Sequence, residues 1–217
     1  MNLGKAVDPT LIVALNVAAT FVFGLSGGLA AVRAKLDIVG VMVLAAVVGL
    51  AGGVTRDLLI GTPPATFRDG RYLAAVGAAG LVCFFAHSVI ERVHRSVLFF
   101  DAIGLSLFCV TGASTALAFG LGATQAIILG AITGIGGGML RDVLLREVPI
   151  VLRSELYAVP ALAGASVVAI AHAAGSNSAA WAVAGAAVCL VIRLLGMRYG
   201  VTLPSAPEER RSDPDAN

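Results

Sequence analysis

The sequence predicts an all-α membrane protein of seven transmembrane helices, arranged as two inverted three-helix repeats and a seventh helix. Three observations predict this fold class. The composition is too apolar for a surface that faces water. The uncharged runs have the lengths of membrane spans, and the first part of the chain superimposes on the second at one fixed shift.

The composition excludes several classes of protein. Hydrophobic residues make up 58% of the 217 residues and charged residues 13%, and the mean hydropathy is +0.93. A soluble domain carries about 25% charged residues, so this chain needs membrane lipids around it. The formal net charge of +2 is too small to indicate a nucleic-acid partner. The three cysteines lie apart in apolar runs, which is typical of buried small hydrophobes, and we expect no cofactor.

The uncharged runs give the spans in order, because a helix needs about 20 apolar residues to cross the hydrocarbon core. Runs at 9–32, 38–55 and 72–90 fit one span each. Two longer runs, at 102–140 and 156–192, divide at the breaks FGLGAT (119–124) and GSNS (175–178). The predicted helices are 10–32, 37–60, 72–91, 98–118, 123–146, 156–174 and 179–199. The charged, Pro-rich tail that follows is expected to be disordered.

The chain repeats itself at a shift of 85 residues, which places GLAGGVTRDLLI (49–60) on GIGGGMLRDVLL (134–145) without a gap. The register also aligns Phe23 with Phe108 and Tyr72 with Tyr157. Because each copy has three spans, the second copy must enter the membrane from the opposite face, which gives inverted repeats. The predicted units are 1–92 (first repeat), 93–174 (second repeat), 175–200 (seventh helix) and 201–217 (cytoplasmic tail).

The distribution of Lys and Arg predicts the orientation, since cytoplasmic loops carry the excess of positive charge. One predicted face collects nine such residues: Arg33, Lys35, Arg92, Arg95, Arg146, Arg153, Arg198, Arg210 and Arg211. The other face has only Lys5, Arg68 and Arg71. We therefore expect a multi-pass protein of the cell inner (plasma) membrane, with its N-terminus outside and its C-terminus in the cytoplasm. Arg193, near the end of the last helix, is expected to snorkel to the interface.

The glycine clusters at Gly52–Gly53 and Gly136–Gly138 are expected to let the second and fifth long helices bend or unwind. Glycine costs about 1 kcal/mol relative to alanine inside a soluble helix, so twin clusters need a reason. Freed backbone groups are tolerated in a bilayer only inside protein or beside a wet cavity. Close packing of helices through small residues is the alternative for these glycines.

An arginine–aspartate pair follows each glycine cluster, Arg56–Asp57 in the first copy and Arg141–Asp142 in the second. Charge inside a membrane is usually functional, which favours a role in a solute path. Adjacent residues on a helix point about 100° apart, so we expect each pair to seek separate partners or a shared aqueous cavity. Anchoring of the arginines at the two interfaces remains the alternative.

Other polar and aromatic residues are weaker candidates. Asn16 lies inside the first helix and must find a bond across helices, whereas its repeat partner Asp101 is expected to cap the fourth long helix. Possible pore-lining residues are Asn16, Phe23, Ser26, Phe108 and Thr111. The histidines do not cluster, and no nucleophile–base or metal constellation is present in the sequence. We therefore expect neither an enzyme nor a metal site beyond a permeant K⁺.

The paired Gly-Gly-x-x-Arg-Asp-like segments in this topology resemble the prokaryotic trimeric intracellular cation (TRIC) channels over about residues 10–199. The resemblance implies a homotrimer in which each subunit holds its own pore for monovalent cations, mainly K⁺. It implies helix kinks at Gly52, Gly53, Gly136, Gly137 and Gly138, and pore or gate roles for Arg56, Asp57, Arg141 and Asp142. The same domain family is also labelled a glycine transporter, so secondary transport of a small solute is the alternative.

An arginine beside a cation path repels K⁺ unless its charge is compensated. Asp57 and Asp142 are candidates for that compensation, and displacement of the arginines as a gate is the alternative. From the sequence we expect alanine at Gly137 and Gly138 to reduce conductance while folding stays normal. We also expect Asp142→Asn to reduce cation flux with little change in stability.

Overall fold

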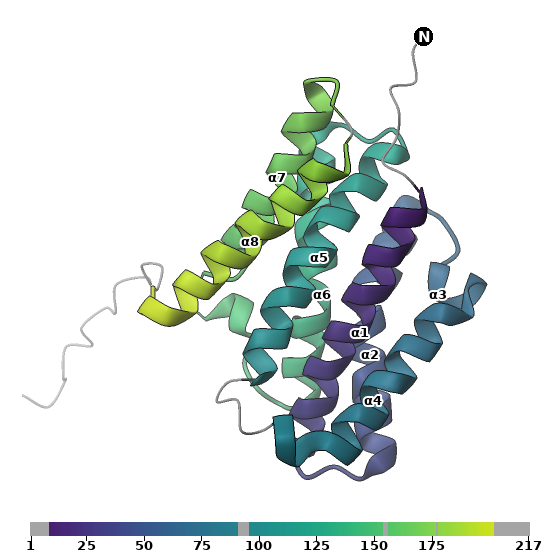
Figure 1. The fold of residues 1–217 in the computed structure, drawn as a ribbon, viewed down its shortest axis with the longest axis vertical. Coiled ribbons are helices and arrows are strands. Elements are labelled where there is room, and N and C mark those ends of the chain that lie inside the picture. Colours follow the sequence, from purple (N-terminus) through teal and green to yellow (C-terminus); the bar gives the residue numbers. More distant parts are fainter. Residues whose placement is uncertain (1–8, 91–95, 154–155, 177, 202–217) are drawn as a thin grey trace, which may run out of the picture.

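The structure is a computed structural model that describes residues 9–90, 96–153, 156–176 and 178–201, with the side chains of 87–90 and 96 left out. The described chain forms eight α-helices and one short 3₁₀ helix (Figure 1). In chain order these are α1 (Pro9–Arg33), α2 (Ile38–Ile60), α3 (Ala65–Arg68), α4 (Gly70–Ile90), α5 (Ser96–Ala118), α6 (Ala123–Leu144), η1 (Ile150–Leu152), α7 (Ala158–Ala173) and α8 (Ala179–Tyr199). The predicted tail, apart from Val201, and the boundary at 92–93 lie outside the described residues.

The predicted helix ranges agree with α1, α2 and α4 to α8 to within a few residues. Five of these helices, α1, α2, α5, α6 and α8, are long and apolar enough to cross a membrane, and α4 and α7 contain shorter apolar stretches. The chain is thus an all-helical membrane protein. The sequence analysis missed α3 and η1, two short helices that each begin directly after a proline, Pro64 and Pro149.

Helices α2 and α6 end in the same way, one residue in left-handed conformation after the last turn. Gly61 has φ 81° and Arg146 has φ 60°. In each case the next N–H bonds back to the carbonyl of the motif aspartate, Thr62 N to Asp57 O at 2.9 Å and Glu147 N to Asp142 O at 2.8 Å. This closure satisfies carbonyls that a helix end otherwise leaves without a partner. Each arginine–aspartate pair is therefore held in the last turns of its helix.

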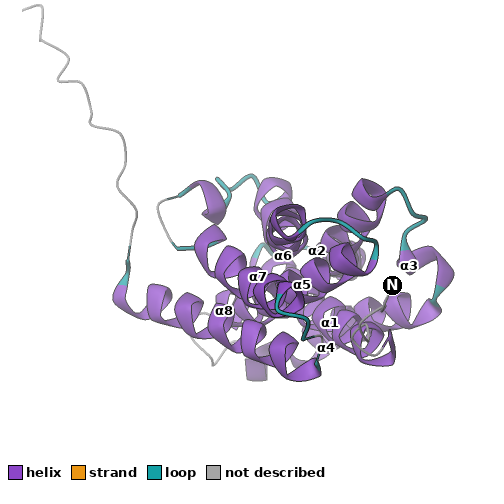
Figure 2. Cartoon of the chain, turned by 90° about the horizontal axis from the view of Figure 1, so that it is seen from above, coloured by secondary structure: helices purple, strands orange, loops and turns teal. Residues whose placement is uncertain are grey.

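Four helices form the centre of the bundle. Helix α1 packs against α2, α4 and α5. Helix α6 packs against α2, α5 and α7. Helix α8 packs against α5 and α7. In Figure 1, α1 and α5 lie side by side in front of α2 and α6, with α4 on one flank and α7 and α8 on the other. The view from above in Figure 2 gives the same arrangement. In Figure 1, α1 begins on the upper right of the bundle, and α8 runs obliquely to end on the left flank.

Gly52 of α2 and Gly137 of α6 lie where these two helices cross. A Cβ on Gly52 would overlap the carbonyl oxygen of Thr133, and one on Gly137 would lie 2.5 Å from the carbonyl oxygen of Val48. Beside the crossing, the rings of Phe23 and Phe108 stack with centroids 5.5 Å apart and an interplanar angle of 22°. These contacts exchange under the 85-residue shift, so the crossing is built alike by both copies.

From the sequence, the glycines are expected to let their helices bend or unwind; the structure contradicts the unwinding, and the bend stays a prediction. Both α2 and α6 are α-helical through the glycine clusters. The absence of side chains lets the two backbones approach, and helical hydrogen bonds keep their polar groups satisfied in an apolar surrounding. Alanine at Gly137 would also press on Val48, so normal folding of a Gly137→Ala variant is no longer expected.

We expect Gly52→Ala to lower the free energy of unfolding by about 1–3 kcal/mol, the usual cost of overpacking, because its methyl group would meet backbone of another helix. Gly53→Ala is the matched control, since a Cβ there meets no atom within 4 Å. The measurement is the unfolding midpoint of both variants in one detergent. Equal midpoints for the two variants would contradict the close crossing.

Candidate functional site

The first arginine–aspartate pair forms a buried cluster with α1. Arg56 Nη1 donates to Asn16 Oδ1 at 2.9 Å. Its Nε donates to Asp57 Oδ1 at 2.8 Å, and its Nη2 lies 2.8 Å from the same oxygen. Asp57 Oδ2 accepts the backbone N–H of Ala65, the first residue of α3, at 2.8 Å. The polar group of Asn16 thus finds its bond across helices, as predicted, and the three side chains are buried.

The second pair repeats this geometry with equivalent residues. Arg141 Nη1 donates to Asp101 Oδ1 at 2.7 Å, while its Nε and Nη2 lie 3.0 and 2.8 Å from Asp142 Oδ1. Asp142 Oδ2 accepts the N–H of Ile150, the first residue of η1, at 2.9 Å. Asp101 and Ile150 stand 85 residues after Asn16 and Ala65. The carboxylate of each motif thus binds its arginine and the short helix that follows.

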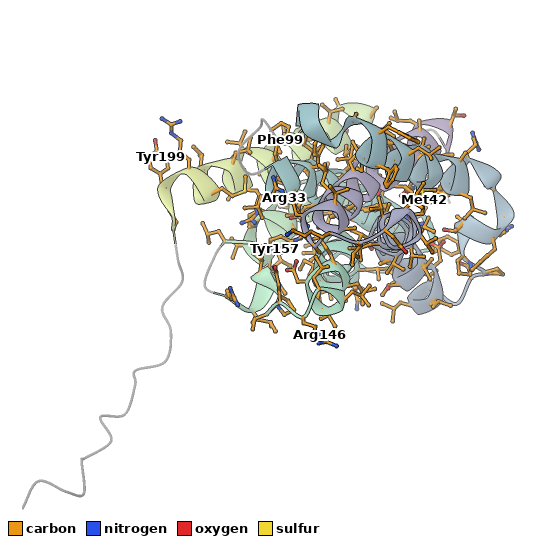
Figure 3. The ribbon with its side chains drawn as sticks, turned by 90° about the horizontal axis from the view of Figure 1, so that it is seen from below. Arg33, Met42, Phe99, Arg146, Tyr157 and Tyr199 are labelled. Carbon is orange, nitrogen blue, oxygen red and sulfur yellow. The ribbon has the colours of Figure 1, made fainter. Side chains whose placement is uncertain are left out.

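The second cluster contains further partners. Ser26 of α1 accepts a hydrogen bond from Arg141 Nη1 at 2.7 Å and donates to Val97 O at 3.1 Å. The Tyr157 hydroxyl donates to Asp101 Oδ1 at 3.1 Å. Tyr157 lies inside the bundle in Figure 3, whereas Arg146 and Tyr199 lie at its periphery. The second cluster therefore draws on α1, α5, α6 and the start of α7.

Arg193 of helix α8 lies beside this cluster. The Arg193 guanidinium lies over the Tyr157 ring, 4.7 Å from its centroid, and its Nη1 donates to Leu156 O at 3.1 Å. Arg193 is fully buried, so the prediction that it snorkels to an interface is wrong. The aromatic face and the carbonyl bind its guanidinium inside the bundle instead.

Two other expectations need correction. The neighbours in each motif do not seek separate partners, because Arg56 and Arg141 bind Asp57 and Asp142 directly. The 100° separation describes where the Cβ atoms point, and the long arginine side chain bends back across it. Asp101 is not a helix cap, since α5 begins at Ser96 and the Asp101 side chain, fully buried, faces Arg141.

Of the other candidate residues, Phe23, Phe108 and Thr111 lie in the core, outside both clusters. The two rings stack on each other, and the Thr111 hydroxyl donates to the carbonyl of Phe108 in its own helix at 3.4 Å. Gly138 makes room for the second cluster, because a Cβ there would meet the Tyr157 hydroxyl and lie 2.7 Å from Asp101 Oδ1. Gly136 lies against Gly52 at the crossing.

A pocket of about 330 Å³ adjoins the second cluster. It lies among the end of α1, the start of α5 and the end of α6, and it is lined by Ala30, Arg33, Ala34, Val97, Leu98, Arg141, Asp142, Leu145, Glu147 and Ile150. Charged side chains of both signs share its wall with apolar ones. The pocket therefore borders the otherwise buried Arg141–Asp142 pair.

Sequence reasoning missed Asp101, Tyr157 and Arg193 as members of this site. The repeat register held the signal for Asp101, because it aligns with Asn16, the residue for which a bond across helices was predicted. It also aligned Tyr157 with Tyr72 without indicating a role for either. No comparable signal exists for Arg193, since α8 follows both copies of the repeat.

Comparison with known proteins gives the family. A family model described as "Glycine transporter" matches residues 13–88 and 98–173, two segments whose ends are both offset by 85 residues. A trimeric intracellular cation channel orthologue from Rhodobacter sphaeroides has a solved structure that superimposes with a TM-score of 0.84 at 37% identity, covering 88% of this chain and 100% of that one. The chain belongs to the TRIC channel family.

Further relatives are also membrane proteins. A solved structure titled for conductance through TRIC cation channels has a TM-score of 0.81 at 33% identity and covers 90% of this chain and 97% of its own. A UPF0126 membrane protein of Streptomyces coelicolor is 46% identical over 207 residues, 94% of this chain and 95% of the relative. The UPF0126 inner membrane protein YadS of Escherichia coli is 34% identical over 194 residues, 88% and 94% of the two chains. This TRIC family member is a multi-pass membrane protein.

We expect Asp142→Asn to lower the free energy of unfolding by about 3–5 kcal/mol, because it leaves Arg141 with a weakened partner in a buried site. This replaces the expectation of little change in stability. Asp69→Asn is the control, since Asp69 pairs at 2.6 Å with Arg71, whose side chain is exposed, and exposed pairs contribute about 0–1 kcal/mol. Unfolding midpoints in one detergent are the measurement, and equal losses would contradict the buried cluster.

Proposed function

We propose that the protein is a channel for monovalent cations, K⁺ foremost, with one pore in each subunit of a homotrimer. The observation that carries the proposal is the pair of equivalent arginine–aspartate clusters buried in the bundle, one beyond each side of the α2–α6 crossing. Helices α2 and α6 run in opposite directions (Figure 1), and each arginine follows its crossing glycine by four residues. The solved relatives named for cation conduction support the same reading.

In the proposed architecture, α1, α2, α4 and α5, α6, α7 are inverted repeats, and α8 is the seventh span. The 85-residue shift converts the contact of Gly52 with Thr133 into that of Gly137 with Val48, which supports this architecture. Equivalent helices also run in opposite directions (Figure 1). The proposed cytoplasmic face contains the end of α1, the start of α5 and the pocket beside Arg141. The N-terminus then lies outside the plasma membrane and the C-terminus in the cytoplasm.

The proposed pore runs past the crossing and between the two clusters. Asp57 and Asp142 offset the arginine charges, so a cation meets little net repulsion. The mutual hydrogen bonds of the clusters correspond to a closed path, and opening requires the arginines to move. The Phe23–Phe108 stack is the apolar constriction of this path, of the kind that gates by excluding water. Bending of α2 and α6 at their glycines accompanies opening.

The outer surface of the bundle supports contact with lipid and with other subunits. Large apolar side chains are exposed on several helices, among them Val43, Leu58, Leu81, Phe85, Ile132, Val143, Trp181, Val183, Val191 and Leu195. In a membrane protein such surfaces face lipid tails or a partner. The homotrimer is proposed from this surface and from the trimeric relative.

Secondary transport of glycine is the second candidate, and the description of the matching family model favours it. A transporter alternates between two faces and saturates with substrate, whereas a channel passes ions in unitary current steps. The solved relatives are named as cation channels, so conduction is preferred.

We expect the purified protein in planar bilayers to give unitary currents in asymmetric KCl, with a reversal potential displaced toward the K⁺ equilibrium potential, as the proposed preference for K⁺ requires. Single-channel recording measures both quantities, and protein-free bilayers are the control. Saturable glycine uptake into proteoliposomes without unitary currents would reject the channel in favour of transport.

We also expect Phe108→Ala to raise the open probability or the unitary conductance, because removing the ring opens the apolar constriction beside the crossing. Phe85→Ala is the matched control, since Phe85 is exposed on the outer surface of α4. Both variants are recorded in bilayers after gel filtration has shown normal assembly. Currents like those of the unmodified protein from an assembled Phe108→Ala variant would move the constriction elsewhere.

A further inference from the structure

The two clusters differ in charge at one equivalent position. Asn16 Oδ1 accepts a hydrogen bond from Arg56 Nη1 at 2.9 Å, and Asp101 Oδ1 accepts one from Arg141 Nη1 at 2.7 Å. A neutral amide oxygen is therefore sufficient to bind an arginine in this geometry. The negative charge of Asp101 is additional to what that hydrogen bond requires.

The additional charge alters the balance of the second cluster. Arg56 and Asp57 cancel each other, whereas Arg141 faces two carboxylates, Asp101 and Asp142. Asp101 is fully buried, and its Oδ2 has no hydrogen-bond partner within the described part of the chain. A buried charge is tolerated when an opposite charge compensates it, so one more positive group near Asp101 would balance the second cluster.

Arg193 is the buried cation that meets this requirement. Its guanidinium lies 4.7 Å from the centre of the Tyr157 ring, and the hydroxyl of that ring donates to Asp101 Oδ1 at 3.1 Å. One aromatic side chain thus connects the two charges. By the 85-residue register, Tyr72 is the equivalent of Tyr157 in the first copy, and the neutral Asn16 is the equivalent of Asp101. The extra carboxylate and the extra arginine therefore occur together, at the second cluster.

We infer that Arg193 is the compensating charge for Asp101 and a positioning residue for the second cluster, acting through Tyr157. The guanidinium binds the face of the ring and holds the hydroxyl toward the carboxylate. The charge of Arg193 leaves Asp101 able to bind Arg141 without an uncompensated charge in the bundle. Helix α8, which has no counterpart in the repeats, thereby controls the site at one end only.

A double-mutant cycle on the full chain tests the inference by stability, independently of conduction. We expect Arg193→Met and Asp101→Asn each to lower the unfolding midpoint by about 5–10 °C, because each leaves one buried charge uncompensated. The double variant should recover at least half of the larger loss, since it recreates the neutral arrangement of Asn16. Arg198→Met, an exposed change on the same helix, should leave the midpoint unchanged. Losses that simply add in the double variant would overturn the inference.

Two further variants separate charge from packing. Arg193→Lys keeps the positive charge without the planar guanidinium, so it should retain more of the midpoint than Arg193→Met. Asn16→Asp adds a carboxylate to the first cluster without a compensating arginine, and we expect it to lower the midpoint. If Asn16→Asp is as stable as the unmodified protein, or if Lys performs no better than Met at 193, compensation by Arg193 is rejected.

The functional arm rests on the proposed cation channel. Arg193→Met should shift the reversal potential in asymmetric KCl, and Asp101→Asn/Arg193→Met should return it toward the unmodified value. A purely structural arginine would change the number of active channels without moving this potential, and that result would overturn the positioning role. If the unmodified protein gives no unitary current, the channel proposal fails while the midpoint cycle still decides the charge pair.

Discussion

The bundle depends on one close approach, that of α2 and α6 through Gly52 and Gly137, where no side chain separates the two backbones. In a bilayer, lipid is as apolar as leucine, so helices associate through close packing and polar contacts more than through exclusion of water. The crossing supplies the packing, and Phe23 and Phe108 fill the space beside it. The arginines then enter the bundle one turn beyond, at a depth that the crossing determines.

Burying an arginine at that depth constrains the chain on both sides of it. Each aspartate binds its arginine through one oxygen and the N–H of a following short helix through the other, at 2.8 Å for Ala65 and 2.9 Å for Ile150. The loops that leave α2 and α6 are therefore tied to the same charges as the helices. A movement of either arginine would therefore also displace the loop that follows it. In this way the aspartates connect the core of the bundle to its surface.

The sequence predicted the long helices closely, because hydrophobic length and charge-free runs determine them almost without tertiary context. It predicted the equivalence of the two motifs, because the 85-residue register needs no structure to be seen. It did not predict that the neighbours Arg56 and Asp57 bind each other. The long arginine side chain bends back across the roughly 100° that separates adjacent Cβ atoms on a helix. It misjudged Asp101 and Arg193, because their roles depend on Tyr157 joining α5 to α8, a contact between distant segments that no local pattern encodes.

The substitution that distinguishes Asn16 from Asp101 has a consequence for the whole duplicated fold. Two identical halves related by inversion would present the same electrical landscape to an ion arriving from either compartment, and the current–voltage relation would be symmetric. Here one cluster holds a neutral amide, whereas the other holds a carboxylate with a second arginine beside it. In the proposed channel the two halves of the path therefore carry different fixed charges, and nothing in the duplicated fold requires the current to be equal in the two directions.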